Sequence, residues 1–309
     1  MVSPLPSPEF VTTPIDWRNV TVIGAAHLLA LSSIAWLTIV QCSPWTIALG
    51  IAWLLLCGFA VTGGYHRLFA HPTYRATAVV RAVYLLFGAA AVQNSALKWA
   101  ADHRLHHAKT DHAEDPYNIR RGFWWAHMGW VFHKDVTPID VARVKDLSAD
   151  PLLRWQDRHY VLIAVLVGFV VPGLLGLAWG DPIGAVLVAG CLRVVVQWHT
   201  TGAVNSFAHR FGSRPHSLAT SARDSAWTAL FTFGEGYHNF HHRFQLDYRN
   251  GARWWQFDPT KWLVWTLARV GLARDLHRTP VEVLARARAQ VARMSEETRS
   301  GTRDSAPRH

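Results

Sequence analysis

Residues 20–40 read VTVIGAAHLLALSSIAWLTIV, an apolar run without a charged side chain. A helix needs about 20 mostly apolar residues to cross the hydrocarbon core of a bilayer. Four buried helices of a large soluble core are the alternative, but charge-free runs of this length rarely suit a partly solvated helix. Three more stretches share the pattern, with Arg193 as their single charge: residues 44–62, 159–179 and 183–207.

These runs predict an all-α integral membrane protein. We place its four transmembrane helices at about 20–42, 44–63, 159–180 and 183–205. A fifth apolar stretch, residues 76–97, contains Arg81, Gln93, Asn94 and Ser95. We expect that stretch to form a helix at the membrane surface or against the other helices, not a fifth span.

Basic residues are distributed unevenly along the chain, which has 31 Lys and Arg and a net charge of +10. Residues 63–158 hold 13 of them and residues 204–309 hold 16, whereas the connections at 41–43 and 180–182 hold none. Positive charge favours the cytoplasmic side, so we expect both termini and the two basic segments there. The net positive charge then mainly reflects the membrane topology, and part of it can attract acidic partners or lipid. It does not indicate a nucleic-acid partner. High Ala and Arg usage favours a bacterial plasma membrane over the endoplasmic reticulum.

Residues 1–285 are assigned to one membrane domain. Residues 286–309 form a charged tail rich in Arg, Ser and Glu, with an end expected to be partly disordered. The N-terminus lacks a basic segment followed by a cleavage site, so the first span should be retained. The three cysteines, Cys42, Cys57 and Cys191, lie in or beside the apolar runs and predict neither a disulfide framework nor a zinc knuckle.

Nine of the 18 histidines fall into four short motifs on the predicted cytoplasmic side or at the cytoplasmic end of a span. They are His66 and His71; His103, His106 and His107; His209; and His238, His241 and His242. The spacing i, i+3, i+4 places three side chains on one helix face. It occurs in DHRLHHAKTDHAEDPY at 102–117 and again in GEGYHNFHHRF at 234–244. On a straight helix His66 and His71 would lie roughly 140° apart, so the helix must end near Pro72 or the pair must straddle the site.

Clustered imidazoles point to metal binding, because protonated rings would repel one another whereas metal-bound rings are neutral. One metal takes four to six ligands, so nine histidines suffice for two metals with room for water or oxygen. Imidazole suits zinc, iron, copper and nickel alike. The motifs therefore predict a dinuclear site without naming the metal. Of the other nine histidines, His112, His127 and His199 are the strongest candidates for a further role.

The motifs also resemble a known family. H-x4-H at 66–71 and H-x2-HH at 103–107 and 238–242, between paired spans, resemble the membrane fatty acyl desaturases, most closely the Δ9 type that includes stearoyl-CoA desaturase. The histidine spacings alone are shared with membrane hydroxylases and ketolases. The sequences around the histidines are more specific to the desaturases. The supporting stretches run in family order from about residue 60 to 251: TGGYHRLFAHPTY, QNSALKWAADHRLHHAKTDHAEDPY, RRGFWWAHMGW, VNSFAHRFG and GEGYHNFHHRFQLDYRNG.

The resemblance implies that residues 1–285 are an oxygen-dependent desaturase domain that makes a cis double bond, at Δ9, in a saturated acyl thioester or acyl lipid. It implies a cytoplasmic helical cap in which the nine histidines hold two irons, with Asn205 holding a metal-bound water. Attack on an unactivated alkyl chain needs an oxidant that no side chain supplies. Iron, cycling between Fe2+ and Fe3+, activates O2, whereas zinc lacks redox states.

The electrons must come from outside the chain. The sequence contains no C-x-x-C-H haem motif, no flavin or nicotinamide glycine fingerprint and no fused cytochrome region. We therefore expect a separate ferredoxin, rubredoxin or cytochrome b5-like donor with its reductase.

Several polar residues lie beside the motifs. Asp102, Glu114, Asp115 and Glu235 could accept imidazole N–H hydrogen bonds and fix the ring orientations, or could cap helices. By resemblance, the positions that line the acyl tunnel or meet the thioester are Gln93, Asn94, Trp99, Asp102 and Thr201. Trp99 could equally belong to an interfacial aromatic belt.

The resemblance also places the tunnel floor in the second span, at Leu49–Trp53. Gly50 aligns best with the floor position, and a small residue there favours long acyl chains. If Trp53 points inward instead, the tunnel is short and medium chains are preferred.

At two places the sequence departs from the pattern of acyl-CoA members of the family and carries less positive charge than a CoA phosphate site would need. Ala101 stands where acyl-CoA members typically have a basic residue, and Lys134 is followed by Asp135 where two basic residues are typical. Acyl-CoA, acyl carrier protein and a membrane lipid therefore all stay open as the acyl holder. An acetylenase or a hydroxylase of the same di-iron class, acting on chains bound to acyl carrier protein, is an alternative enzyme. A non-enzymatic histidine-rich membrane metal protein is a second alternative, with His27 and Arg193 as its intramembrane candidates.

Overall fold

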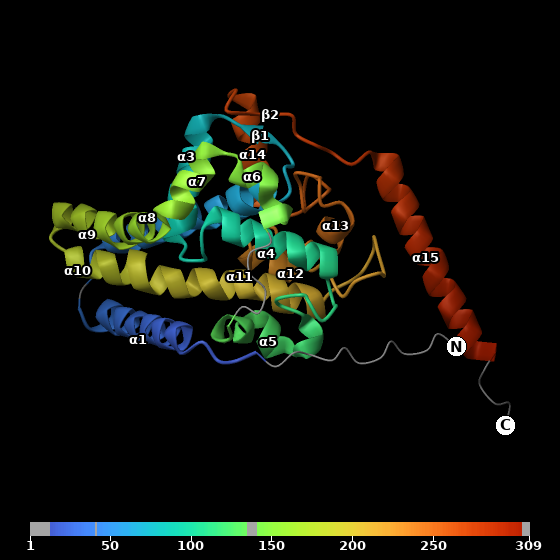
Figure 1. The fold of residues 1–309 in the computed structure, drawn as a ribbon, viewed down its shortest axis with the longest axis horizontal. Helices are drawn as coiled ribbons and strands as arrows, with labels where there is room; N and C mark the ends of the chain where they lie inside the picture. The colour runs from blue at the N-terminus through green and yellow to red at the C-terminus, as the bar shows by residue number, and fades with distance from the viewer. Residues whose placement is uncertain (1–12, 41, 135–140, 305–309) are drawn as a thin grey trace.

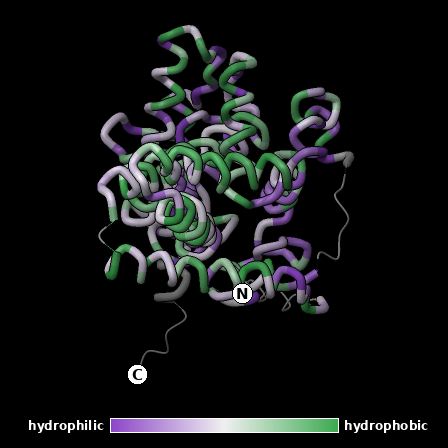
Figure 2. Tube along the Cα trace, turned by 90° about the vertical axis from the view of Figure 1, so that its left-hand side faces the viewer, coloured by the Kyte–Doolittle hydropathy of each residue, from purple (hydrophilic) through white to green (hydrophobic). Residues whose placement is uncertain are grey.

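The computed structural model of the chain describes residues 13–40, 42–134 and 141–304 (Figure 1). Four of its helices are long and apolar enough to cross a membrane, which confirms the predicted membrane fold. They are Trp17–Ile39, Pro44–Ala70, Tyr160–Trp179 and Pro182–Arg210. Large apolar side chains on these helices, such as Leu31 and Leu174, are exposed in the isolated chain, as expected of surfaces that contact lipid. Figure 2 shows long helical stretches of hydrophobic residues along the chain.

Three of the four spans are assembled from shorter helical segments. The first is the single helix α1 (Trp17–Ile39), and the second joins α2 (Pro44–Phe59) to the π-helical segment η1 (Ala60–Ala70). The third runs through α8 (Tyr160–Val165), η5 (Leu166–Val170), α9 (Val171–Gly176) and η6 (Leu177–Trp179). The fourth runs through α10 (Pro182–Ala185), η7 (Val186–Leu192) and α11 (Arg193–Arg210). Of these segments, η5 and η7 are also π-helical, so the hydrogen-bond register changes inside the membrane.

The two short connections between spans lie together at one end of the bundle. Asp181 caps α10 by accepting from the Gly184 N–H at 2.9 Å. Its other carboxylate oxygen accepts from the Thr46 hydroxyl at 2.7 Å and lies 3.6 Å from the Cys42 thiol. The Trp179 indole donates to the same Thr46 hydroxyl at 2.9 Å. The ends of the second, third and fourth spans are thus joined far from the histidine motifs.

Arg193 is the charged residue inside the fourth span, and it is buried. Its guanidinium donates to three backbone carbonyls, those of Ala189 at 2.9 Å, Ala90 at 2.6 Å and Gly168 at 3.2 Å. Gly168 and Ala189 belong to the π-helical segments, where carbonyls lose their usual i+4 partner. Arg193 therefore satisfies backbone groups that lipid could not.

The fifth apolar stretch forms α3 (Ala78–Ala90), too short to span a membrane, as predicted. It packs closely on η1 through two glycines. A Cβ atom at Gly64 would lie 2.6 Å from the Tyr84 side chain, and one at Gly88 would lie 2.3 Å from the Tyr65 ring. Each glycine thus accommodates an aromatic ring of the neighbouring helix.

The remaining elements form a cap at the end of the bundle that carries the histidines (Figure 1). Its two-residue strands β1 and β2 pair antiparallel, with Arg75 opposite Arg274. The elements are β1 (Arg75–Ala76), α4 (Ala96–Lys109), η2 (Ile119–Arg121), α5 (Phe123–His127), η3 (Gly129–Phe132), η4 (Val141–Val144), α6 (Lys145–Ser148), α7 (Pro151–Arg158), α12 (Ala226–Phe231), α13 (His238–Arg243), α14 (Pro259–Arg269) and β2 (Ala273–Arg274).

The charged C-terminal segment is helical over most of its length. Helix α15 (Val281–Asp304) runs along the side of the cap, away from α8 and α9 (Figure 1). Its sequence is rich in Ala, Arg and Glu, all good helix formers. The division into a domain of residues 1–285 and a tail of 286–309 therefore cuts through this helix. Residues 305–309, to which the expected disorder applies, lie outside the described residues.

Candidate metal centre

The two triple-histidine motifs lie on helices, as their spacing predicts. Helix α4 begins at the cap residue Ser95, whose hydroxyl accepts from the Lys98 N–H at 3.3 Å. It carries the first motif on its inward face, and His103 and His106 are buried. The second motif makes up most of α13, a helix of only six residues in which His238 and His241 are buried.

The first pair of histidines shares a face because the second span ends as a π-helix. The His71 N–H donates to the His66 carbonyl at 3.0 Å, the i to i+5 bond of that helix type. This bond places the sixth residue above the first, and the two ring centroids lie 5.0 Å apart. The 140° separation expected for an α-helix therefore does not apply.

All nine motif histidines meet in the cap, where their ring nitrogens form two groups. Within each group the candidate ligand atoms lie within 4.8 Å of one another. The groups are His66, His71, His103, His107 and His241, and His106, His209, His238 and His242. Each group thus combines histidines from at least three of the four sequence motifs.

Ring nitrogens converge at distances typical of two ligands on one metal. In the first group the Nε2 of His241 lies 3.0 Å from the Nε2 of His66 and 3.0 Å from that of His107. In the second group the Nε2 of His242 lies 3.3 Å from that of His106 and 3.1 Å from that of His238. A bond length of about 2.1 Å to each nitrogen would span these gaps.

The electrostatics of the cluster favour neutral rings. Burial, followed by the mutual repulsion of the histidines, lowers the pKa values of His71, His103, His107, His241 and His242 well below the ordinary value. The same causes lower the pKa of His238 to about 3. In the second group, the buried Nε2 of His209 has no hydrogen-bond partner among the described residues. Neutral imidazoles and a free buried nitrogen fit a pair of metal ions.

Two of the four carboxylates suggested by the sequence orient histidines. Glu235 lies 2.8 Å from the Nδ1 of His66, and Asp115 lies 2.8 Å from the Nδ1 of His106. Each holds its ring so that Nε2 points into a metal group. The other two carboxylates bind lysines: Asp102 contacts Lys98 at 2.6 Å, and Glu114 contacts Lys109 at 3.0 Å.

Glu235 belongs to a buried ionic network behind the first group. Its carboxylate accepts from the Arg67 guanidinium at 2.8 Å and from the Asn250 amide at 2.5 Å. Arg67 also contacts Asp258 at 3.0 Å. Burial alone would raise the pKa of Glu235, but its interactions with His66 and Arg67 lower it to about 2. Glu235 is therefore a fixed negative charge beside the site.

Sequence reasoning did not identify a second route of ring orientation. The Nδ1 of His209 lies 2.7 Å from the Ser221 hydroxyl, which donates to Asp111 at 2.5 Å. Asp111 follows the histidine motif of α4 by only four residues, and its φ of 68° is unusual for a residue other than glycine. The position of Asp111 in DHAED, next to a histidine motif, was the one sequence signal for this contact. Ser221 lies 110 residues after Asp111, and no sequence pattern marks it as a partner.

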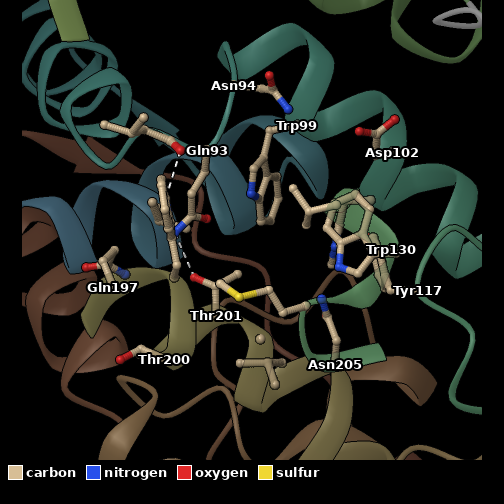
Figure 3. Close-up of a pocket in the computed structure, with 18 of the residues that line it drawn as sticks. Gln93, Asn94, Trp99, Asp102, Tyr117, Trp130, Gln197, Thr200, Thr201 and Asn205 are labelled. Carbon is tan, nitrogen blue, oxygen red and sulfur yellow. Dashed lines mark hydrogen bonds between the residues drawn. The ribbon is translucent and has the colours of Figure 1, made fainter. Parts of the chain in front are cut away.

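A cavity of about 290 Å³ opens against the histidines. Five of the six residues proposed to bind substrate line it, together with Asn205 (Figure 3): Gln93, Asn94, Trp99, Asp102 and Thr201. The Gln93 amide donates to the Thr201 hydroxyl at 2.9 Å. The Trp99 indole stacks on the His103 ring, with centroids 4.8 Å apart. Trp99 thus joins the cavity wall to the metal groups and does not sit in an interfacial belt.

Gly50 lies elsewhere. It is not among the described residues lining the cavity, and a Cβ atom there would meet the Val188 side chain of η7 at 2.7 Å. Trp53 does point inward, packing in a cluster with Cys57 and Val61, and Val61 lines the cavity. The Gly50 position is small because two spans approach closely there.

A membrane-spanning helical bundle capped by two groups of buried histidines defines a class of dinuclear metalloproteins. Comparison with known sequences narrows this class. The family model described as fatty acid desaturase matches residues 43–276, and the chain belongs to the fatty acid desaturase family.

Individual relatives agree with this assignment. The chain is 45% identical to acyl-CoA desaturase 1 of Saccharomyces cerevisiae over 72% of its length, although it spans only 44% of that protein. It is 36% identical to stearoyl-CoA desaturase 5 of Bos taurus, covering 90% of this chain and 84% of the relative. It is also 36% identical to Delta(9)-fatty-acid desaturase fat-7 of Caenorhabditis elegans, covering 92% and 85%.

Proposed function

We propose that the protein is an oxygen-dependent acyl-CoA desaturase that introduces a cis double bond, at Δ9, into a saturated chain. The observation that carries this proposal is the meeting of nine histidines, in two groups, beside a cavity whose wall includes His66, His103 and His238. The relatives are named as acyl-CoA, stearoyl-CoA and Delta(9) desaturases, which supports the same chemistry here.

We assign two irons to the site. Bound by the nine histidines, with Asn205 holding a water, they would supply the O2 activation that no side chain can provide. The protein's own residues exclude bulk water from the rings, hold them neutral and, through Glu235 and Asp115, fix their orientation. The reaction removes two hydrogens from the chain and takes two electrons from an external ferredoxin, rubredoxin or cytochrome b5-like donor. Together with two protons, these reduce O2 to two waters.

CoA is the proposed acyl carrier, in line with the names of the relatives. The sequence at Ala101, Lys134 and Asp135, which left the acyl carrier open, does not argue strongly against CoA. Ala101 is 4% exposed and packs in the hydrophobic core of the cap, so a residue there would not face a phosphate without rearrangement. Lys134 is exposed, and Asp135 lies outside the described residues.

Product analysis tests the proposal. The protein would be produced in a host lacking its own desaturase, with the donor chain supplied, and its fatty acids analysed by mass spectrometry. A cis Δ9 monounsaturated product is expected. A hydroxyl or a triple bond would instead indicate the related hydroxylase or acetylenase. An unchanged fatty-acid profile, obtained with iron-loaded protein and a working electron donor, would favour the non-enzymatic metal protein.

We propose a cytoplasmic active site, with both termini and residues 63–158 on that side. Support comes from the bundle itself: His66 and His209 lie near the ends of two spans, whereas Asp181 joins the opposite ends. Reporter fusions at 41–43 and 180–182 should report the outer side, and cytoplasmic accessibility of either connection would contradict the topology. The relatives come from yeast and animals, so they lend no support to a bacterial plasma membrane.

Chain length should be set at Val61. Trp53 and Cys57 fill the space next to Val61, and the Trp53 indole is held by a hydrogen bond to the Val167 carbonyl at 2.9 Å. Val61→Phe would occupy space that terminal methylenes need, at a cost of about 0.8 kcal/mol for each methylene that can no longer be buried. We therefore expect preference to shift toward shorter chains by several carbons.

Competition between acyl-CoA substrates of different length measures this shift. Val165→Phe, which adds the same ring to an exposed position on α8, is the matched control and should leave the profile unchanged. A wild-type profile in well-folded Val61→Phe protein would place the end of the cavity elsewhere.

A further inference from the structure

Three histidines outside the metal centre form a continuous chain across three helices. His27 lies on α1, His199 on α11 and His127 at the end of α5. The Nε2 atoms of His27 and His199 are 3.2 Å apart, and the Nδ1 of His199 is 3.0 Å from the Nε2 of His127. Because His199 uses opposite ring nitrogens for its two neighbours, the rings are arranged in series and do not converge on one ion. We call these three residues the histidine chain.

Each end of the histidine chain has a polar partner. At one end the Nδ1 of His27 lies 2.7 Å from the Ile23 carbonyl. Because a carbonyl oxygen can only accept a hydrogen bond, this Nδ1 must carry a proton. At the other end the Nδ1 of His127 lies 2.8 Å from the Ser206 hydroxyl. That hydroxyl is also 2.8 Å from the Gly202 carbonyl. The hydroxyl can therefore donate to His127, or accept from His127 and donate to Gly202.

A proton count shows that the histidine chain has two satisfied states. Three neutral imidazoles and one hydroxyl hold four protons. With Ser206 donating to His127, four protons fill the four contacts that involve ring nitrogens. With one added proton, His127 donates to Ser206, and Ser206 completes the fifth contact by donating to the Gly202 carbonyl. No ring nitrogen loses its partner in either state, so one proton can be taken up or released without structural rearrangement.

The position of the histidine chain indicates where that proton would go. His127 lines the same cavity as His66, His103 and His238 of the metal centre. Ser206 follows Asn205 directly on α11. His27 and His199 lie within the first and fourth spans, where ionisable side chains are costly and usually functional.

The surroundings favour release over permanent charge. Burial lowers the pKa of His127, and a hydrogen bond with the Gly202 backbone offsets part of this effect. The charged residues on the elements around the three rings stand near the element ends. They are Asp16 and Arg18 before and within α1, Arg120 and Arg121 before α5, and Arg193 and Arg210 at the two ends of α11. Arg193 is occupied with carbonyls, and Arg121 stacks on the Trp125 ring.

We propose that the histidine chain stores one proton and delivers it through His127 into the cavity while O2 is reduced. The inference rests on the proposed desaturase function. The balance is complete: the substrate gives up two hydrogens, the external carrier gives two electrons, and two protons from the protein and solvent complete two waters. The histidine chain supplies one of those protons and is refilled from water in the cavity.

The metal-free protein provides the first test, independent of turnover. With 15N-labelled histidine, the rings of His27, His199 and His127 should respond together to the uptake of one proton as the pH is lowered. His199→Gln should abolish this joint response, because an amide can hydrogen-bond to both neighbours but cannot pass a proton from one to the other. His133→Gln is the matched control: the Nδ1 of His133 contacts the Gly129 carbonyl at 3.0 Å, as His27 contacts Ile23, without a histidine partner among the described residues. Separate titration of the three rings, or no uptake before acid unfolding, would overturn the proposal.

The second test uses the iron-loaded enzyme. His199→Gln should lower kcat about tenfold, below the usual contribution of a proton donor in direct contact with substrate, with KM unchanged. Ser206→Ala, which removes the hydroxyl that links the two states, should lower kcat in the same direction if His199→Gln fails to fold. A purely structural role predicts that Gln at position 199 restores activity, and wild-type kcat in both variants would refute delivery. If the wild-type enzyme forms no double bond, the desaturase function fails, and the 15N titration still decides whether the proton store exists.

Discussion

His241→Ala is expected to abolish desaturation and to release metal from the first histidine group. Its Nε2 faces both His66 and His107 at 3.0 Å, so it stands at the centre of that group. The effect should exceed the roughly 10- to 100-fold change caused by removing a ligand's hydrogen-bond partner. His106→Ala should act likewise on the second group. Metal analysis of the active wild-type protein should give close to two Fe per chain.

The control for both variants is His133→Ala, which removes a histidine outside the groups and should keep activity and metal content. Full activity with one iron per chain, or unchanged turnover in His241→Ala and His106→Ala, would refute the dinuclear site. Zinc in overproduced protein would not, because zinc outcompetes ferrous iron at nitrogen ligands.

Glu235→Gln is expected to weaken metal binding by about 10- to 100-fold, since a carboxylate behind a ligating histidine sets its orientation and basicity. The amide keeps the shape of the side chain but removes the charge that faces His66 and Arg67. Retention of iron during titration with a chelator measures the effect, and thermal unfolding of the metal-free protein shows whether the fold persists.

Glu114→Gln is the matched control for this variant. Glu114 makes its ion pair with Lys109 at the surface, where both side chains are largely exposed. Its replacement should change stability by no more than about 0.5 kcal/mol and leave metal affinity unaltered. Equal chelator resistance in Glu235→Gln and the wild-type protein would show that His66 needs no carboxylate to hold its orientation.

Local sequence patterns predicted the parts of this protein that repeat with helical periodicity. The charge-free runs located four spans, and the i, i+3, i+4 spacing located the inward faces of α4 and α13. Of the positions proposed from the resemblance, Trp99 and Asp102 lie on α4 and Thr201 lies on α11. Gln93 and Asn94 lie in the turn that leads into α4, and all five positions line one cavity.

Long-range contacts were beyond such patterns. Gly50 was proposed from the resemblance, but which face of a span meets η7 depends on how the spans cross. Ser221 became a partner of His209 only because a loop without periodicity folds back onto α11. The division of the nine histidines into a group of five and a group of four likewise follows from how the cap is assembled.

The π-helical end of the second span has a consequence for how this site could have arisen and how it can change. Each hydrogen bond of η1 closes over one residue more than in an α-helix, so one inserted residue can create a turn of this type and one deletion can remove it. Deleting one residue within Ala60–Ala70 would restore ordinary winding, but everything beyond the deletion would rotate by about 100° around the axis. His71 would then swing out of the first group while the span kept its length and hydrophobicity. The site therefore constrains the number of residues in this segment, in addition to the identity of residues such as His66 and Gly64.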